Sequence, residues 1–544
     1  MKDKFNEIFR SKGVNYLTQD LPLSDFLKFF SFNEDDDLKV LGEYVSEELI
    51  EIMDYVDHNG KPELIMWNLD GKRIDYVRIS PEHRKALKKL QDLGVVIKSA
   101  SGEQPWMYHF VAGYLISDSG IFCSLTLTAQ TAYALRKYFG GNEKFTDHYL
   151  DKKDPWYGAT FYSETQGGSD LGANKTRATE IESGWVLNGS DKYFASNAGI
   201  ADGAIVTAMT GNGGIRSLET FFVPAVKKTG ELNYTIRRLK NKMGTIAVPS
   251  GEVDLVDSEA YLIGERGKGI YYAMEILTIS RIDDALAAVG IARKALWEAY
   301  LHTEKRSAFG KKLKEHPLMM KDIISLEAEL EGSLIISLYA AKLFSDVANV
   351  KPPYNDAYNY ARFITHIAKN MAAWSSDHIT QYSMEIFGGI GFFEEFPMPK
   401  FHRDALVTSI WEGTSNIQAL DMLETILKKG VGEIFLNDLK ARSEGITEIN
   451  LRNKVNKRIE FVENQFNTLL ESGSIEMGSK DLLKLFGQAL SLTLLAQSGS
   501  ELKSERLLEI SVVYDIISFE SNRIQFDDSF RNIDLVKWMQ IDYV

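Results

Sequence analysis

Residues 401–421 read Phe-His-Arg-Asp-Ala-Leu-Val-Thr-Ser-Ile-Trp-Glu-Gly-Thr-Ser-Asn-Ile-Gln-Ala-Leu-Asp. Within this stretch the carboxylate Glu412 follows two apolar residues and precedes Gly413. A glycine lets the backbone approach a ligand closely, and free N–H groups at a helix start suit a phosphate or an electron-rich ring edge. Taken alone, the stretch favours an ordinary loop glutamate ahead of a helix cap, with a ligand site as the alternative that the rest of the chain has to support. The helix, which either Thr414 or Ser415 can cap, is predicted by the spacing of Ile417, Leu420, Leu423 and Ile426.

The composition is that of a large globular protein. With 544 residues, 44% of them hydrophobic and 25% charged, the chain can bury a large core and should hold several subdomains. The formal net charge of -14 argues against broad attraction to nucleic acid or anionic membrane. A single cysteine, Cys123, excludes an internal disulfide and a Cys-based zinc site, and no metal site is predicted. The charged start and the absence of a long apolar run predict a cytoplasmic protein without a membrane span.

Hydrophobic periodicity divides the chain into four regions. Residues 1–157 are predicted to be a helical N-terminal domain, with one apolar stripe through Leu38, Leu41, Val45, Leu49 and Met53. Residues 158–266 change to short β-rich runs separated by Gly, Asn, Asp and Ser, which predicts a small β domain. Helical period returns in residues 267–429, as a bundle of four long helices, and continues through a C-terminal extension over 430–544. The predicted fold class is α+β.

Individual elements follow from the same patterns. The β-rich runs span 159–163, 185–187, 204–208, 219–223 and 252–256. The long helices of the bundle are predicted over 270–303, 317–347, 354–387 and 415–427.

Five motifs now identify a family. They are Phe-Tyr-Ser-Glu-Thr-Gln-Gly-Gly-Ser-Asp at 161–170, Asp-Lys-Tyr-Phe-Ala-Ser-Asn at 191–197, Arg-Ser-Ala-Phe-Gly at 306–310, Phe-Gly-Gly-Ile-Gly at 387–391, and Trp-Glu-Gly-Thr at 411–414. The first four resemble, in order and spacing, the flavin-binding segments of the acyl-CoA dehydrogenase superfamily, and the fifth resembles its catalytic segment. The resemblance covers residues 21–427 and is greatest to the AidB-like branch. It implies that family's fold, with a central small β-barrel-like domain and a C-terminal four-helix bundle, and FAD as cofactor.

The first two motifs suit a flat heterocycle. Hydroxyl groups and the backbone of two glycines offer several hydrogen-bond donors at a strand end, although a serine-capped glycine hairpin is the alternative. The resemblance implies that Ser163 and Ser169 contact the flavin and that Ser169 also touches the CoA portion of a thioester substrate. It further implies that Phe194, Ala195 and Ser196 pack against the isoalloxazine ring. A phenylalanine in a strand is otherwise normally a core residue.

The next two motifs are implied to hold the rest of FAD. Arg306 and Phe309 match the family segment that reaches the FAD pyrophosphate of a neighbouring subunit, and guanidinium geometry suits phosphate. Glu385, Gly388 and Gly389 match the adenosine-contacting stretch, although Glu385 stands where many relatives have glutamine. A homotetramer built from dimers is therefore expected. A solvated arginine at a helix end is the alternative for Arg306.

The resemblance implies a task for Glu412. Forming a 2,3-double bond in an acyl thioester requires removal of the α-proton while the β-hydrogen leaves as hydride to the flavin N5. A desolvated carboxylate with a raised pKa can act as that base. Some relatives place the base just before Arg281, where this chain has Ser280, which cannot serve, and Glu275 lies on another helix face. The same resemblance assigns Trp411, Gly413, Thr414 and Asn416 to cofactor binding and Gly413 and Arg281 to substrate binding.

Two functions are kept open. The first is an FAD-dependent acyl-CoA dehydrogenase of fatty acid metabolism that passes electrons to an electron-transfer flavoprotein. The second is an AidB-like, DNA-associated protective flavoprotein with secondary dehydrogenase activity. Tight DNA binding is not expected, because residues 430–544 carry more acidic than basic side chains and their one basic cluster spans only 452–458. Arg281 has a second interpretation, a surface ion pair with Asp283 and Asp284.

Overall fold

The structure is a computed structural model that describes residues 4–140, 143–211, 214–520 and 532–536. It contains helices, one large sheet and short hairpins, so the predicted α+β fold class is confirmed. The chain forms two compact units. The sheet unit comprises Leu49–His109 and Asp118–Asp283, and the helical unit comprises Met1–Glu48, Phe110–Ser117 and Asp284–Val544. Two helices, α7 (Trp106–Ile116) and α10 (Gly269–Lys305), continue from one unit into the other.

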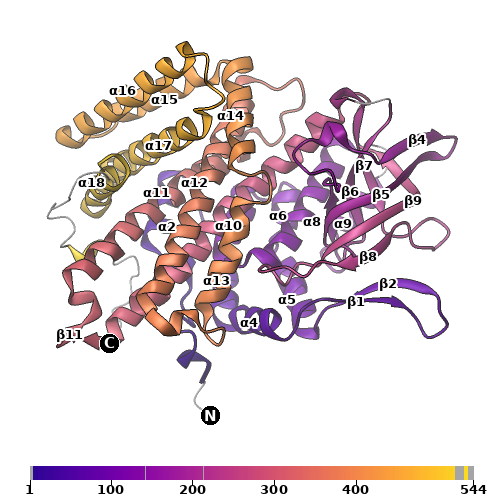
Figure 1. Ribbon diagram of the computed structural model, residues 1–544, viewed down its shortest axis with the longest axis horizontal. Coiled ribbons are helices and arrows are strands. Elements are labelled where there is room, and N and C mark those ends of the chain that lie inside the picture. The colour runs from indigo at the N-terminus through magenta and orange to yellow at the C-terminus, as the bar shows by residue number, and fades with distance from the viewer. Residues whose placement is uncertain (1–3, 141–142, 212–213, 521–531, 537–544) are drawn as a thin grey trace. The chain divides into compact units, whose positions relative to one another are not determined.

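A seven-stranded sheet forms the centre of the sheet unit (Figure 1). Its order is β3-β5-β4-β6-β7-β9-β8, and additional pairings of β3 with β6 and of β5 with β9 close it into a small barrel-like sheet. The two long strands β5 and β9 pair antiparallel along most of their length with several bulges, which bend a sheet. The strands are β3 (Gly158–Phe161), β4 (Arg177–Ile181), β5 (Gly184–Ser196), β6 (Gly203–Met209), β7 (Leu218–Pro224), β8 (Thr235–Leu239) and β9 (Ser250–Leu262).

The five predicted runs all overlap strands, but two strands of the large sheet and two hairpins outside it were not predicted, one of them the short pair of β10 (Ser307–Ala308) and β11 (Lys311–Lys312). Strands β6 and β7 are buried along their whole length, which explains why most of their residues are apolar. Strands β4 and β8 are mostly polar and partly exposed, so hydrophobicity did not reveal them. The hairpin of β1 (Glu63–Trp67) and β2 (Arg73–Arg78) lies in the region predicted to be helical. Asp75 of this hairpin accepts a hydrogen bond from the Ile236 N–H of β8 at 2.8 Å.

Helices complete the sheet unit. Helix α8 is buried over most of its length and packs on β3. Asn197, just after β5, donates to the Ser124 carbonyl of α8 at 3.0 Å and to the Gly158 carbonyl of β3 at 2.8 Å. The helices of this unit are α4 (Ile50–His58), α5 (Pro81–Asp92), α6 (Ile97–Ala100), α8 (Ser119–Tyr138) and α9 (Glu143–Tyr149).

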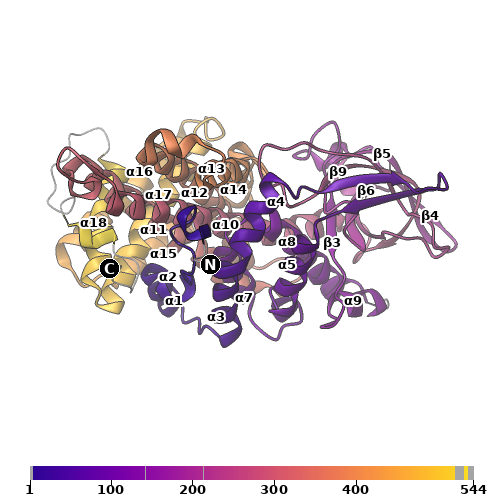
Figure 2. The same ribbon diagram turned by 90° about the horizontal axis from the view of Figure 1, so that it is seen from below.

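Long helices make up the helical unit, and the predicted bundle corresponds to α10, α11, α12 and α14. Helix α12 packs against both α11 and α14, as Figures 1 and 2 show. The N-terminal stripe is buried, as predicted. The bundle helices other than α10 are α11 (Pro317–Val347), α12 (Asp356–Phe387) and α14 (Ser415–Lys429), and α13 (Pro397–Leu406) precedes the last; the N-terminal helices are α1 (Tyr16–Gln19), α2 (Leu21–Phe29) and α3 (Asp36–Tyr44).

The described part of the C-terminal extension is helical and packs on the bundle. Helix α17 contacts α11, α12 and α14, and α18 contacts α11. Arg506 of α18 forms an ion pair with the buried Glu331 of α11, which fastens the extension to the bundle through a charged contact. Residues 521–531 and 537–544 of the predicted extension lie outside the described residues. Its helices are α15 (Val431–Glu444), α16 (Ile449–Glu471), α17 (Ser479–Leu502) and α18 (Glu505–Phe519). No described helix is long and apolar enough to cross a membrane.

Candidate functional site

A buried ion pair joins the first two motifs within the sheet unit. Lys192 on β5 lies with its Nζ 2.9 Å from Oε1 of Glu164, and both side chains are buried. The Glu164 carboxylate also accepts hydrogen bonds from the Lys175 N–H and from the N–H and hydroxyl of Thr176. The Lys192 ammonium donates to the Thr207 carbonyl at 2.8 Å. Burial lowers the pKa of Lys192 to about 8, against the opposing effect of Glu164.

This ion pair sets two predicted segments next to each other. The Tyr193 N–H donates to the Ser163 carbonyl at 3.0 Å, and Ser196 pairs with Thr160 in the β3–β5 register. Gly168 approaches Ser163 so closely that an added Cβ would lie 2.3 Å from the serine hydroxyl oxygen. The glycine at 168 is therefore required by the turn that brings the chain back to Ser163.

The predicted flavin-contacting residues of these two segments differ in solvent exposure. Phe194 is 52% exposed, so the alternative that this strand phenylalanine is a core residue is wrong. The Lys240 ammonium lies 4.6 Å from the centroid of the Phe194 ring. Ala195 is buried, Ser163 and Ser196 are half-buried, and Ser169 is exposed. The segments thus present an aromatic face and hydroxyl groups beside a cation.

The charged residues around Arg281 are buried, and this overturns one sequence-based alternative. Arg281, Asp283 and Asp284 are each less than 5% exposed, so they form no surface ion pair. In the sheet unit Asp283 lies with Oδ2 3.1 Å from Nε2 of His109. Residues 278–301 of α10 are all buried, and these three groups lie in that stretch. Arg281 remains predicted as a substrate-binding residue.

Glu275, on the same helix, is committed to other contacts. It is buried, and Oε1 accepts from the Lys137 ammonium at 2.6 Å and the Tyr133 hydroxyl at 2.5 Å. Oε2 accepts from the Tyr138 hydroxyl at 2.7 Å. Both carboxylate oxygens of Glu275 are thus taken up by donors from α8, which gives this side chain a structural role. Ser280, at the position where some relatives have a base, donates its hydroxyl to the Leu277 carbonyl at 3.1 Å.

The loop that carries Glu412 has an unusual backbone. Glu412 has φ 56° and Gly413 has φ 100°, so two successive residues occupy the left-handed region just before α14. A left-handed conformation is uncommon for a residue with a side chain and costs on the order of 1–3 kcal/mol. An added Cβ at Gly413 would also lie 2.8 Å from Nε2 of Gln418, so glycine is required there. Helix α14 begins at Ser415 as predicted, with Thr414 as N-cap residue, but no side-chain hydrogen bond caps it.

Contacts from three helices hold this loop. The Trp411 indole N–H donates to Oδ1 of Asp284 on α10, and the Lys369 ammonium on α12 donates to the Gly413 carbonyl at 3.0 Å. Lys369 also lies 3.5 Å from Oδ2 of Asp284. Gln418 of α14 donates its side-chain amide to the carbonyls of Glu412 and Gly413, at 2.9 Å each.

Electrostatics links this cluster to the predicted base. Burial raises the pKa of Asp284, whereas the Lys369 ammonium and the Trp411 indole N–H oppose the rise and the charge of Glu412 adds to it. Glu412 itself is half-buried, so its carboxylate keeps some access to solvent. Two carboxyl groups and one ammonium therefore interact at this loop, and the protonation state of each affects the others.

The two predicted FAD segments of the bundle lie near each other at the ends of α10 and α12. His302, on the last turn of α10, stacks on Phe387 with ring centroids 4.4 Å apart. Arg306 follows four residues later and is exposed, and its guanidinium has no carboxylate within ion-pair distance among the described residues. Phe309 is 97% exposed in a small hairpin with φ 51°. Gly388 and Gly389 are exposed with open space around them, and Glu385 is exposed on the last turn of α12.

The basic cluster of the extension is partly neutralised within its own fold. Arg458 on α16 forms ion pairs with Asp515 and Glu520, each at 2.7 Å. Arg452 donates to the Ile446 carbonyl at 2.7 Å. Lys454 and Lys457 are the exposed members of the cluster. A face with two exposed lysines neutralises few phosphates.

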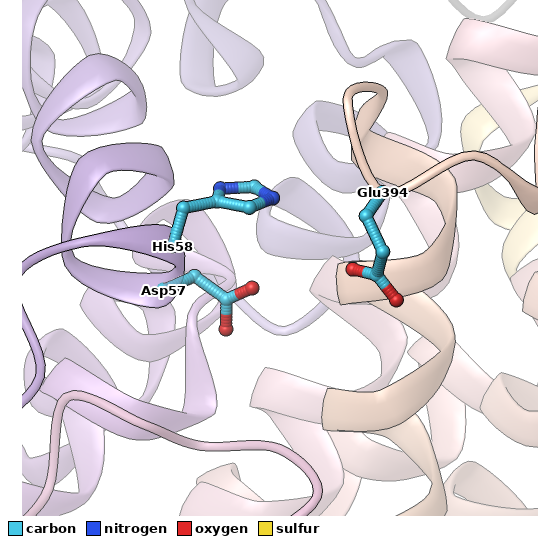
Figure 3. A group of neighbouring side chains, drawn as sticks. All are labelled: Asp57, His58 and Glu394. Carbon is cyan, nitrogen blue, oxygen red and sulfur yellow. The ribbon is translucent and has the colours of Figure 1, made fainter.

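A further polar group and a pocket involve none of the predicted site residues. Figure 3 shows Asp57, His58 and Glu394, of which the first two lie on the last turn of α4. The His58 Nδ1 lies 2.9 Å from the Asp54 carbonyl oxygen. Glu394 forms an ion pair with Arg403. A pocket of about 280 Å³ in the sheet unit is lined by residues of β2, α5 and the segments 154–157 and 199–202, and none of the predicted site residues lines it.

The residues that support the Glu412 loop were missed at the sequence level. Asp284 was considered only as a partner for Arg281, and Lys369, Gln418 and His366 were not considered. A signal existed in α12, where Lys369 interrupts an apolar run between Ile367-Ala368 and Met371. A lysine on a buried helix face needs a partner, and this need could have pointed to the cluster.

Models of known families match two parts of the chain. The acyl-CoA dehydrogenase middle domain matches residues 159–258, and the acyl-CoA dehydrogenase C-terminal domain matches residues 267–427. AidB of Escherichia coli (strain K12) is 29% identical over 388 residues, which cover 68% of this chain and 70% of that protein. Acyl-CoA dehydrogenase family member 11 of Caenorhabditis elegans is 30% identical over 438 residues, or 75% of this chain and 68% of that protein.

Solved structures share the fold. ACDH-11 of Caenorhabditis elegans, in complex with C11-CoA, superimposes with a TM-score of 0.80 at 23% identity and covers 93% of this chain and 90% of that chain. An acyl-CoA dehydrogenase from Bacillus anthracis complexed with FAD gives a TM-score of 0.69 at 19% identity and covers 93% and 91%. At these identities the likeness concerns the fold.

Proposed function

Because this chain belongs to the acyl-CoA dehydrogenase family and is an oxidoreductase, we propose that it oxidises an acyl-CoA thioester to the 2,3-enoyl-CoA with Glu412 as the base. The observation that carries this proposal is the strained loop of Glu412. A carboxylate in a left-handed turn, with hydrogen bonds to the residues on both sides, is held in one orientation at an energetic cost. Such a cost is typical of functional residues.

The residues present fit FAD. An exposed aromatic ring at Phe194, hydroxyl groups at Ser163 and Ser196, and an exposed guanidinium at Arg306 are the groups that a flavin dinucleotide requires. Gly388 and Gly389 leave open space where any side chain would project. These residues, with Ser169, Ala195, Phe309, Glu385, Trp411, Thr414 and Asn416, would hold the cofactor. When bound, FAD supplies the acceptor for the hydride that leaves the β-carbon.

Side chains of this protein would remove the α-proton of the substrate and bind the acyl-CoA. The Glu412 carboxylate would take the α-proton of the thioester, and the half-buried setting favours this because a partly desolvated carboxylate is a stronger base than one in water. Arg281, Ser169 and Gly413 would bind the acyl-CoA. Glu275 and Ser280 are excluded as the base by the contacts described above.

The partners follow from the same family. We assign an electron-transfer flavoprotein as electron acceptor and a homotetramer as the assembly. Arg306 and Phe309 would reach the FAD of a neighbouring subunit, and the exposure of both side chains supports this role.

A DNA-associated protective role is the second candidate, and the charges of α16 speak against it. Arg458 is occupied by two carboxylates and Arg452 by a backbone carbonyl, which leaves two exposed lysines. Tight binding to duplex DNA requires several cations on one surface. We therefore place the metabolic role first.

The test is an anaerobic titration of the purified FAD-containing protein with a panel of acyl-CoA thioesters. At least one thioester should bleach the visible absorption of the flavin, whereas free CoA should not. A protein that dithionite reduces but that no straight-chain, branched or aryl acyl-CoA reduces would contradict the proposal.

A further inference from the structure

Five side chains form a continuous polar network behind the Glu412 loop. Asp284 of α10 accepts the Trp411 indole N–H, and Lys369 of α12 contacts both Asp284 and the Gly413 carbonyl. Gln418 of α14 donates to the carbonyls of residues 412 and 413, and the Nδ1 of His366 of α12 lies 2.9 Å from the Gln418 Oε1. We call Asp284, His366, Lys369, Trp411 and Gln418 the loop clamp. All five belong to the helical unit.

We propose that Asp284 and Lys369 are positioning residues that hold Glu412 in its left-handed conformation and set the proton affinity of its carboxylate. Asp284 fixes the residue before Glu412, through the indole of Trp411, and Lys369 fixes the residue after it, through the Gly413 carbonyl. The proposal rests on the proposed function of Glu412 as the base. It adds two residues that touch neither substrate nor cofactor in that function.

Because the loop clamp is buried, its charges act strongly on neighbouring groups. Asp284 is 4% exposed and Lys369 is 1% exposed, and a charge in such a site interacts with its neighbours far more than a charge in water does. The charged and titratable groups that face Asp284 are Lys369 from α12 and Glu412 from the loop, with the Trp411 indole as a neutral donor. Burying an aspartate–lysine pair costs free energy of desolvation unless both side chains also form hydrogen bonds. Here both members bond to the loop itself.

The two charges should move the proton affinity of Glu412 in opposite directions. Asp284→Asn keeps an oxygen that can accept the Trp411 indole N–H but removes the negative charge that Asp284 carries when it is ionised beside Lys369, which leaves the Lys369 ammonium to favour ionised Glu412. Lys369→Met removes the positive charge, so ionised Glu412 loses the stabilisation that the ammonium gives, and the pKa of Asp284 rises further because the ammonium no longer opposes the effect of burial. An opposite or like charge within about 4–6 Å shifts a carboxyl pKa by about one unit or more.

The experiment measures the rate of flavin reduction by a reactive acyl-CoA in single turnovers from pH 5 to pH 10, with the FAD-containing protein. This rate should rise with pH as the base loses its proton. We expect the rise to shift by about one pH unit or more to lower pH in Asp284→Asn and to higher pH in Lys369→Met. The maximal rate should fall about tenfold to a hundredfold in both, because the carboxylate is less well placed.

The double variant Asp284→Asn/Lys369→Met removes both charges and leaves none unpaired, so it remains informative if a single variant does not fold. Its pH profile should return toward that of the wild type. Asp404→Asn is the matched control, because Asp404 is also buried and pairs with a lysine, Lys400, at 2.8 Å, but on α13. It should leave the pH profile unchanged.

Two results would overturn the proposal, and they differ from failure of the proposed function. If Glu412→Gln abolishes flavin reduction but the Asp284 and Lys369 variants keep the wild-type pH profile, the loop clamp does not set the proton affinity of the Glu412 carboxylate. Shifts of the same sign in the two single variants would also contradict it, because they would reflect general damage. If Glu412→Gln itself reduces the flavin normally, the proposed function fails, whatever the clamp variants do.

Discussion

Replacing Glu164 by glutamine tests whether the buried ion pair holds the two flavin-contacting segments of the sheet unit together. Glutamine has the shape of glutamate, but it removes the charge opposite the Lys192 ammonium, which is 0% exposed. Its amide N–H₂ would also face the donors of Lys175 and Thr176, which now point at carboxylate oxygens. The substitution thus leaves one buried charge unpaired and disrupts the turn that follows Ser163.

The size of the effect follows from the burial of Lys192. Removing one partner of a buried ion pair typically costs about 3–5 kcal/mol. The folded variant can instead release the lysine proton, and because the pKa of Lys192 is already lowered to about 8 in the wild type, its release at pH 7 costs only about 1.4 kcal/mol relative to the wild type, at about 1.36 kcal/mol per unit. The expected loss in the free energy of unfolding at pH 7 therefore lies between about 1.4 kcal/mol, where the proton is released, and about 3–5 kcal/mol, where the charge stays unpaired.

The loss should depend on pH with a definite sign. In the wild type the folded-state pKa of Lys192 is lowered to about 8, so below pH 8 the folded and unfolded states both hold the proton and this lysine adds no pH dependence. In the variant the folded state should release the proton at lower pH, whereas the unfolded state keeps it. Since the unfolded state then binds more protons, the stability of the variant rises with pH, approaching about 1.4 kcal/mol per unit. The difference in free energy of unfolding between the wild type and the variant is therefore larger at pH 6 than at pH 8.

Urea unfolding at pH 6, 7 and 8 measures this difference in free energy of unfolding. Gel filtration measures FAD retention, which should also fall in the variant. Glu63→Gln is the matched control in the same unit, because Glu63 pairs with Arg78 on the surface, with both side chains more than half exposed. That variant should unfold at nearly the same urea concentration as the wild type at every pH, because an exposed ion pair contributes little to stability. A loss below about 1 kcal/mol for Glu164→Gln, or a difference that does not narrow with rising pH, would refute the reasoning.

Three further outcomes are expected. Glu412→Gln should keep FAD but slow flavin reduction by acyl-CoA at least on the order of a thousandfold, as loss of a general base does; Glu424→Gln, on the same helix and paired with Arg362, is the control, and near-normal single-turnover reduction would remove Glu412 from the mechanism. Arg306→Ala should weaken FAD retention and lower oligomer stability together, since a ligand across an interface stabilises it; analytical ultracentrifugation with and without FAD would show an unchanged oligomer if the arginine serves only its own subunit. Duplex DNA should bind no better than about micromolar at physiological salt, and an anisotropy titration whose salt dependence implied six or so neutralised phosphates would favour the DNA-associated role instead.

Local patterns predicted the long helices well. Helix α11 spans Pro317–Val347, as predicted, and α12 and α14 differ from their predicted bounds by two residues. Periodicity succeeds here because a helix that buries one face repeats its apolar residues every three to four positions. The same criterion missed β4 and β8, whose exposed polar residues hide the strand pattern, and the β1–β2 hairpin, whose strands are partly exposed. Each of these strands is held by pairing with the next strand along the chain, and the hydrophobic period within a single strand does not report such a pairing.

The sequence by itself determined the α+β class, the order of the motifs and the identity of the acid that the family motif marks, Glu412. These features are local, because each depends on residue types at short spacing. Only the tertiary structure decided which charges surround that acid. The Trp411 indole donates to Asp284 from 127 positions away, and Lys369 reaches the Gly413 carbonyl from 44 positions away. Such pairings depend on how α10, α12 and α14 pack, and burial then gives the charges their strength, so neither could be predicted from spacing along the chain.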